Sequence, residues 1–204
     1  MPDAQNSLTW TGYPDAGEIR DQHGSLWATY AGELLGPSAK DLPSSGRVVV
    51  RSGSLDGPAF ETWGPKGWEA LEARCESIVE SEATLLVLPH AGDVLSDVQR
   101  CLKFLDRWAE AIEPIGLIVD PAALMTESML DREADHLGRM AASLISRRGV
   151  AGVVVPSEAE KDTIPASAWE PMMVAARAHR VPVISACQPA QAAEPVPAES
   201  RPSP

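Results

Sequence analysis

Several apolar runs in this chain end in side chains that could bind a ligand or transfer a proton. A guanidinium follows one run, an imidazole the next, and a carboxylate a third. If the runs are neighbouring parallel strands, their polar carboxyl ends lie at the same end of the sheet. Ligands bind at that end in both open and closed parallel sheets. The candidate residues are Arg51, Ser52, His90, Asp120, Ser157 and Glu158.

Three of these candidates could bind an anion. Arg51 is followed by Ser52-Gly53-Ser54, and guanidinium and backbone N–H groups suit the oxygens of a phosphate or carboxylate. Ser157 would add a hydroxyl to the same ligand site. The alternative is that these groups are polar only because loops that leave a sheet usually are.

The other three could perform acid–base chemistry. His90 and Asp120 could act as an acid/base pair, and Glu158 could supply a further carboxylate. Asp120 is the strongest candidate, because an unpaired carboxylate at the end of a very apolar strand would be costly. A bond from Asp120 to neighbouring loop amides is the structural alternative.

Five apolar runs could place these side chains. Each is apolar nearly throughout, which is typical of strands covered on both faces of a parallel sheet. Amphipathic helical patterns separate the runs, so the chain reads as βα units with right-handed crossovers. The runs are RVVVRSG (47–53), TLLVLPH (84–90), IGLIVDP (115–121), VAGVVVP (150–156) and VPVISA (181–186).

The two ends of the chain break this alternation. We interpret residues 1–46 as an N-terminal extension, weakly structured or covering a sheet edge, in which LTWTG is a short strand and SLWATYAGELL a short helix. Residues 47–187 form the predicted α/β domain. Residues 188–204, rich in proline and alanine, are predicted to be a disordered tail, because they bury too little apolar surface to offset ordering.

Composition excludes some classes of partner. The chain has 204 residues, with 29 acidic and 17 basic side chains and a formal charge of -12. Such an acidic protein repels phosphate backbones, so we expect no nucleic-acid partner. No signal peptide or membrane-spanning run is present, and the three cysteines are far apart, so we expect a cytoplasmic protein without a membrane partner.

Motifs for the common cofactors are missing as well. The chain has no P-loop, no GxGxxG after a strand, no GxSxG elbow, and no HExxH or paired Cys/His spacing. We therefore expect no cofactor.

The segments LLVLPHAGDVLSDVQRCLKFLDRW and PIGLIVDPAALM resemble the later half of xylose-isomerase-like TIM barrels, the superfamily of sugar-phosphate isomerases/epimerases and endonuclease IV. The resemblance covers roughly residues 46–187. It implies an α/β fold: a shortened or partial TIM-like barrel of about five βα units with parallel strands. The alternative is an open doubly wound parallel sheet.

The family binds a divalent metal at its strand ends, and this chain departs from that pattern. The resemblance places Arg51 at the position of one histidine ligand, Leu88 at that of a glutamate, and Ala123 at that of a second histidine. Only Asp120 is kept. One carboxylate cannot hold a catalytic metal, so we expect a degenerate site without metal.

Three functions follow from this sequence. The first is a diverged sugar-phosphate isomerase/epimerase-like protein that lacks the metal-dependent chemistry of the family. The second is an active sugar isomerase or epimerase that uses His90, Asp120 and Glu158. The third is a non-catalytic protein that binds a partner or assembles with itself. The expected partners are a small anionic or sugar ligand and a second copy bound through a sheet edge.

Overall fold

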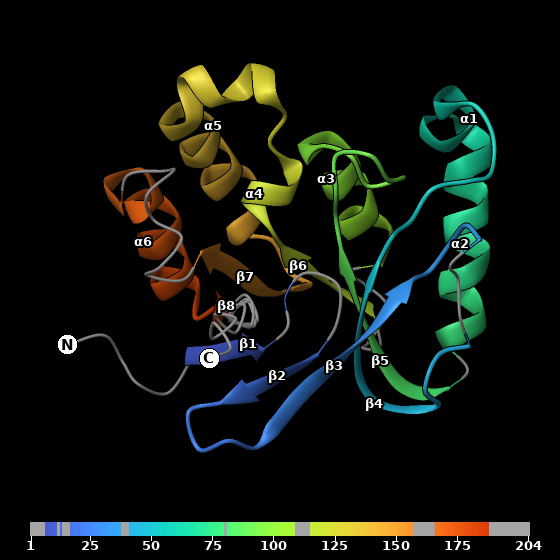
Figure 1. Cartoon of the computed structure of the whole chain (residues 1–204), viewed down its shortest axis with the longest axis horizontal. Helices are drawn as coiled ribbons and strands as arrows, with labels where there is room; N and C mark the ends of the chain where they lie inside the picture. Colours follow the sequence, from blue (N-terminus) through green and yellow to red (C-terminus); the bar gives the residue numbers. More distant parts are fainter. Residues whose placement is uncertain are drawn as a thin grey trace, which may run out of the picture.

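Eight strands close into one barrel, in sequence order around the ring (Figure 1). A computed structural model describes residues 7–11, 13, 17–37, 41–79, 81–108, 115–156 and 166–187. Strand β1 pairs with β8, and this pairing closes the sheet. The strands are β1 (Ser7–Thr11), β2 (Glu18–Asp21), β3 (Leu26–Glu33), β4 (Ser45–Arg51), β5 (Glu82–Leu88), β6 (Ile115–Val119), β7 (Val150–Pro156) and β8 (Val183–Cys187).

The barrel is mixed. Strand β2 runs antiparallel to both β1 and β3, whereas the other six pairings are parallel. The predicted fold class, a partial TIM-like barrel of five βα units or an open doubly wound sheet, is therefore wrong. The description as a xylose-isomerase-like TIM barrel is corrected with it. The physical reason lies in the first 46 residues, where β3 pairs with the edge of β4, β1 pairs with the edge of β8, and β2 joins β1 to β3.

An antiparallel hairpin joins β2 to β3. The side chain of Asp21 accepts hydrogen bonds from the backbone N–H groups of His23 (2.8 Å) and Ser25 (2.9 Å). Gly24 takes the left-handed conformation that closes the turn, with φ of 80°. The helix predicted in SLWATYAGELL is wrong, because most of this segment is β3; the short strand predicted at LTWTG is confirmed as β1.

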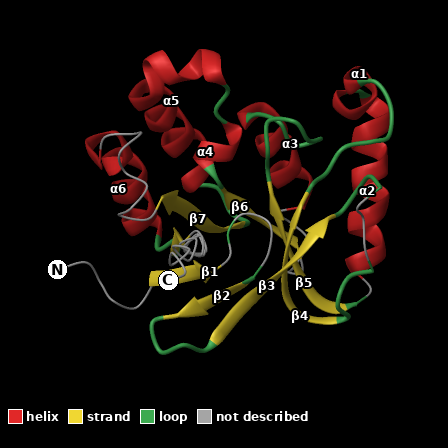
Figure 2. Ribbon diagram, viewed as in Figure 1, coloured by secondary structure: helices red, strands yellow, loops and turns green. Residues whose placement is uncertain are grey.

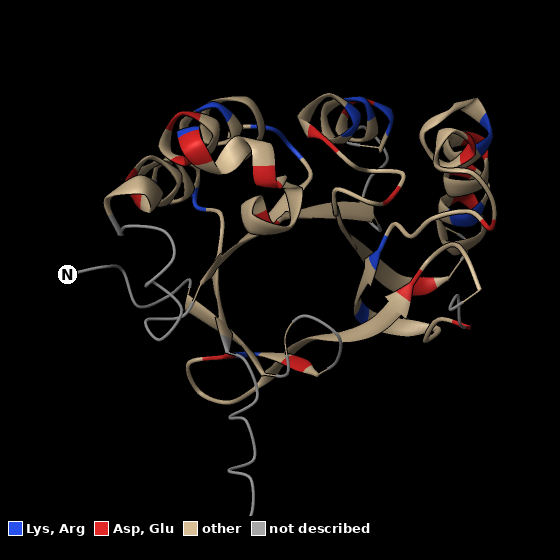
Figure 3. Ribbon diagram, turned by 45° about the horizontal axis from the view of Figure 1, so that its top comes forward, with Lys and Arg blue, Asp and Glu red and all other residues tan. Residues whose placement is uncertain are grey.

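The described helices cover the side of the barrel formed by β4 to β8 (Figure 2). Seen from a tilted view, the strands form a ring with these helices outside it (Figure 3). A π-helical turn at Ala141–Ile145 continues α5, and short 3-10 helices span Glu127–Arg132 and Ala166–Trp169. The α-helices are α1 (Ala59–Trp63), α2 (Pro65–Val79), α3 (Val98–Trp108), α4 (Pro121–Leu124), α5 (Glu133–Met140) and α6 (Glu170–His179).

The strands separate two apolar cores. Side chains of alternate residues point to opposite faces of a strand, so Val49 belongs to the cluster inside the barrel and Val48 and Val50 to the cluster beneath the helices. Trp10 and Ile118 are also fully buried inside the barrel. The interior is therefore filled by side chains that are mostly apolar. Polar inward-facing positions include Arg51 at the end of β4, and Arg47 at the start of β4, where it lies over the ring of Trp27.

Within the described residues, every helix is too short or too polar to cross a lipid bilayer.

Candidate functional site

Polar side chains gather where β3, β4, β5 and β6 end, which we call the mouth of the barrel. The spacing follows the strand alternation: Arg51 comes two residues after the inward-facing Val49, and Asp120 two residues after Ile118. The mouth is formed by Tyr13, Glu33, Arg51, His90, Asp93 and Asp120.

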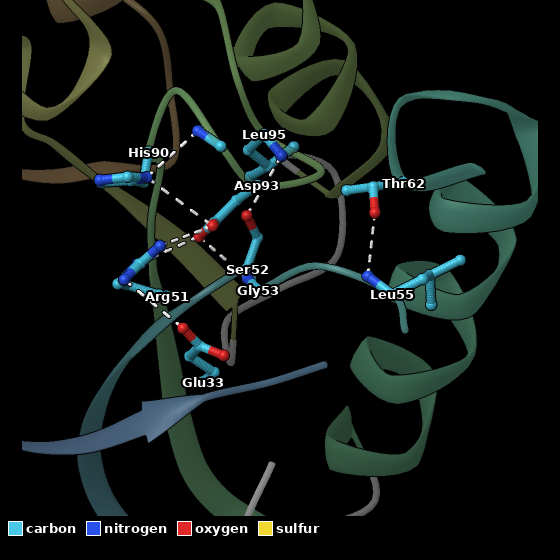
Figure 4. Close-up of polar contacts among 10 residues, drawn as sticks. Glu33, Arg51, Ser52, Gly53, Leu55, Thr62, His90, Asp93 and Leu95 are labelled. Atoms are coloured by element: carbon cyan, nitrogen blue, oxygen red, sulfur yellow. Dashed lines mark hydrogen bonds and ion pairs between the residues drawn. The ribbon is translucent and has the colours of Figure 1, made fainter. Parts of the chain in front are cut away.

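Arg51 lies between two carboxylates (Figure 4). Its Nε and Nη2 donate to Asp93 Oδ2 (3.2 Å) and Oδ1 (2.7 Å), and its Nη1 lies 3.4 Å from Glu33 Oε1. Burial lowers the pKa of Arg51, but the bonds and charges of Asp93 and Glu33 outweigh it and raise the pKa overall. The positive charge of Arg51 is therefore compensated within the protein.

Asp93 also ties two loops together. Its Oδ2 accepts the backbone N–H of Gly53 at 3.0 Å, and Gly53 in turn accepts the N–H of Val94 through its carbonyl at 3.0 Å. Beside these bonds, Ser52 Oγ accepts the N–H of Leu95 at 3.1 Å. The Asp93 carboxylate thus occupies the guanidinium and one of the amides that the sequence suggested for an external anion.

His90 is the most exposed polar group at the mouth, with 42% of its side chain accessible. Its Nδ1 accepts the N–H of Gly92 at 3.2 Å and lies 3.8 Å from Asp93 Oδ1, so the neutral ring carries its proton on Nε2. Nε2 points away from Asp93 (Figure 4). The loop therefore fixes the imidazole through Nδ1, while Nε2 faces away from Asp93.

Asp120 is a buried carboxyl group, with only 1% of the residue exposed. It caps α4: Oδ1 accepts the N–H of Ala123 at 3.1 Å, and Oδ2 accepts the hydroxyl of Tyr13 at 2.5 Å. Burial raises the pKa of Asp120, although bonds from Tyr13 and Ala123 and the nearby charge of His90 act to lower it.

A backbone hydrogen bond holds the segment that carries His90 against the segment that carries Asp120. The N–H of Ala91, next to His90, donates to the carbonyl of Ala123 at 2.9 Å, and Ala123 is the residue that donates to Asp120. Beneath them, Trp10 contacts the rings of Tyr13 (5.1 Å between centroids) and Tyr30 (5.6 Å). These three aromatic side chains make the side of the site that faces the barrel interior apolar.

The structure brings Arg51, His90 and Asp120 to the mouth. Ser52 is fully buried, and its hydroxyl oxygen accepts the backbone N–H of Leu95. Ser157 and Glu158 lie outside the described residues.

Three mouth residues were missed by sequence reasoning: Tyr13, Glu33 and Asp93. Asp93 had a usable signal, because it is the carboxylate of the loop PHAGD that carries His90.

In the part of the chain that the structure describes, no three His, Cys, Asp or Glu side chains lie close enough to hold a metal ion. At the mouth Glu33 and Asp93 both contact the guanidinium of Arg51, so their oxygens do not converge on a shared metal position.

Asp120 should make stability depend on pH. Its pKa is raised in the folded protein, so between its unfolded and folded pKa values the folded state binds more protons, and stability falls as pH rises through this window. Asp120→Asn keeps an acceptor for Ala123 and removes the titration. We expect the variant to gain stability relative to the wild type as pH rises, measured by urea unfolding at several pH values. A difference that stays constant with pH, or that reverses, would contradict the raised pKa.

Comparisons with protein-family models, with curated proteins and with solved structures gave no match to this chain. The class of protein is therefore defined by its own fold and site: a closed, mixed eight-stranded barrel with a buried carboxyl group, Asp120, at its mouth. The isomerase or epimerase activity implied by the resemblance stays a prediction from the sequence alone.

Proposed function

We propose that the mouth of the barrel binds a small polar molecule without negative charge, such as a polyol or an amine, and that Asp120 and His90 transfer protons to and from it. The observation that carries this proposal is the Asp120 carboxyl group, buried at the mouth, bonded to Tyr13 and close to a half-exposed imidazole.

The charges at the mouth favour this class of ligand over an anion. Arg51 is paired with Asp93 and Glu33, so one guanidinium faces two carboxylates before Asp120 is counted. A phosphate would have to displace Asp93 from Arg51 and from the Gly53 amide. A hydroxyl or ammonium group could instead donate to a carboxylate without breaking these bonds.

Burial prepares Asp120 for proton transfer. A raised pKa brings a carboxyl group closer to neutral pH, where the same group can both give and accept a proton efficiently. Tyr13 orients the carboxyl group through Oδ2, and the Ala123 amide does so through Oδ1. His90, which is accessible to solvent, could carry the proton between Asp120 and water.

The cytoplasmic location expected from the sequence is likewise a proposal. Cys75 on α2 and Cys101 on α3 are buried free thiols. Burial raises the pKa of each to about 12, so both behave as small apolar side chains that need no oxidising compartment.

Binding can be tested with three probes of different charge: glycerol, ethanolamine and inorganic phosphate. We expect the first two to shift the backbone amide NMR signals of Gly92 and Ala123, which flank the site, and phosphate to leave them in place. Asp120→Asn should weaken the response to ethanolamine, because the carboxylate charge is lost.

A matched control is Asp135→Asn, which changes an exposed carboxylate on α5. It should leave the response of the mouth unchanged. Larger shifts with phosphate than with glycerol and ethanolamine would contradict the proposed ligand class. Equal shifts with ethanolamine in the wild type, Asp120→Asn and Asp135→Asn would show that Asp120 does not contribute to binding.

A further inference from the structure

A second surface lies on the outside of the barrel, between α2 and α3. It is a groove with a volume of about 750 Å³. Trp63 and Trp68 line it from the side of α1 and α2, and next to it Phe60 on α1 is 71% exposed. Trp63 is 45% exposed, whereas Trp68 is buried and Lys103 Nζ lies 3.8 Å from the centroid of its ring. Exposed apolar patches with a polar rim, such as Phe60 and Trp63 here, mark interaction surfaces.

The short helix α1 is held rigidly beside this groove. Arg100 of α3 donates to the carbonyl of Trp63, and the N–H of Leu55 donates to Thr62 Oγ1 at 3.0 Å. At Gly67 of α2 an added Cβ would lie 2.0 Å from the carbonyl oxygen of Thr62, so the two helices approach closely. Little conformational freedom remains to be lost when a partner covers the aromatic residues.

The two walls of the groove carry opposite charges. Glu69 and Glu72 line it from α2, and Arg100 and Lys103 line it from α3, which Asp97 precedes. Arg100 lies 3.7 Å from Asp97, and Glu72 lies 3.2 Å from Arg107, so Glu69 and Lys103 are the opposite charges that these two pairs do not neutralise. A two-fold axis along the groove would place α2 of one copy against α3 of the other, so each acidic wall would face a basic wall. The groove is therefore complementary to itself, although the whole chain has a formal charge of -12.

We propose that the groove between α2 and α3, with α1 beside it, is the interface between two copies of this chain. Phe60 and Trp63 on α1 supply exposed apolar contact area, and the paired walls set the orientation of the two copies. This interface replaces the sheet edge expected from the sequence, because the described barrel is closed. It is independent of the ligand proposed for the mouth.

Charge exchange tests this arrangement. In the two-fold dimer Glu69 faces Lys103 twice, so Lys103→Glu and Glu69→Lys each create two repulsive contacts. We expect sedimentation velocity between about 5 and 500 μM to show a wild-type dimer and a dissociation constant raised at least about tenfold in each variant. An equimolar mixture of the two variants restores both attractive contacts and should recover the dimer.

Val174→Ser, an exposed apolar residue on α6, is the matched control and should dimerise like the wild type. Circular dichroism confirms that each variant is folded. A wild-type protein that stays monomeric at the highest concentration would overturn the proposal. Single variants that dimerise normally, or a mixture that stays monomeric, would overturn it too.

Discussion

Asp93→Ala is expected to lower the free energy of unfolding by about 3 kcal/mol, one of the two largest effects that we predict. The substitution leaves Arg51, three-quarters buried, with the longer contact to Glu33 as its remaining ion pair among the described residues. It also leaves the Gly53 amide without its acceptor. Because removal of one partner exposes the full desolvation cost of the other, the loss exceeds that of an ordinary ion pair. Urea unfolding at neutral pH measures it.

Asp135→Ala is the matched control for Asp93. Its contact with Arg139 is as short (2.8 Å against 2.7 Å), but both side chains are at least half exposed. Exposed i,i+4 pairs contribute little, so the expected loss is about 0.5 kcal/mol. Equal losses in the two variants would show that burial of the Arg51–Asp93 pair does not matter.

Gly53→Ala is expected to cost about 3 kcal/mol, for two separate reasons. Gly53 has φ of +75°, a conformation that strains any residue with a Cβ. In addition, the new Cβ would lie 2.4 Å from the backbone carbonyl oxygen of Leu35, which cannot move as a side chain could. The midpoint of thermal unfolding and the urea midpoint should both fall.

Gly24→Ala separates these two causes. Gly24 has nearly the same φ, +80°, but nothing lies within 4 Å of the position of its Cβ. Only the backbone strain remains, so we expect a cost of about 1 kcal/mol. If both alanines cost the same, the close approach between Gly53 and Leu35 is not as tight as described.

The strands β4 to β8 could be predicted because each is an almost continuous apolar run. Val48, Val49 and Val50 show why: the first and third pack beneath the helices, and the second packs inside the barrel. A run buried on both faces is visible in the sequence without knowledge of its partners. The same runs located Arg51, His90 and Asp120, because each lies at or just after the end of a strand.

The N-terminal strands could not be predicted in the same way. Strand β2, EIRD, has one buried residue, Ile19, and shows no pattern over four positions. In β3 the apolar residues Leu26, Trp27 and Tyr30 also fit a helical spacing, and that interpretation was wrong. Closure of the barrel depends on the pairing of β1 with β8, which are far apart in the chain.

The partners of the site residues could not be predicted either, because they lie far away in the sequence. Arg51 indicated an anion site, and the anion is Asp93, a side chain 42 positions later. Tyr13 meets Asp120 across 107 positions. Sequence reasoning located individual groups, but the electrostatic balance of the mouth depends on contacts that only the fold creates.

Titration of the Asp120 carboxyl carbon by NMR tests the central claim, a buried acid–base group at the mouth, most directly. The account predicts a pKa above the ordinary value of 3.8, and a further rise in Tyr13→Phe, which removes a hydrogen bond that stabilises the carboxylate. A pKa at or below the ordinary value would contradict the account, because a carboxyl group so placed would be a fixed structural charge.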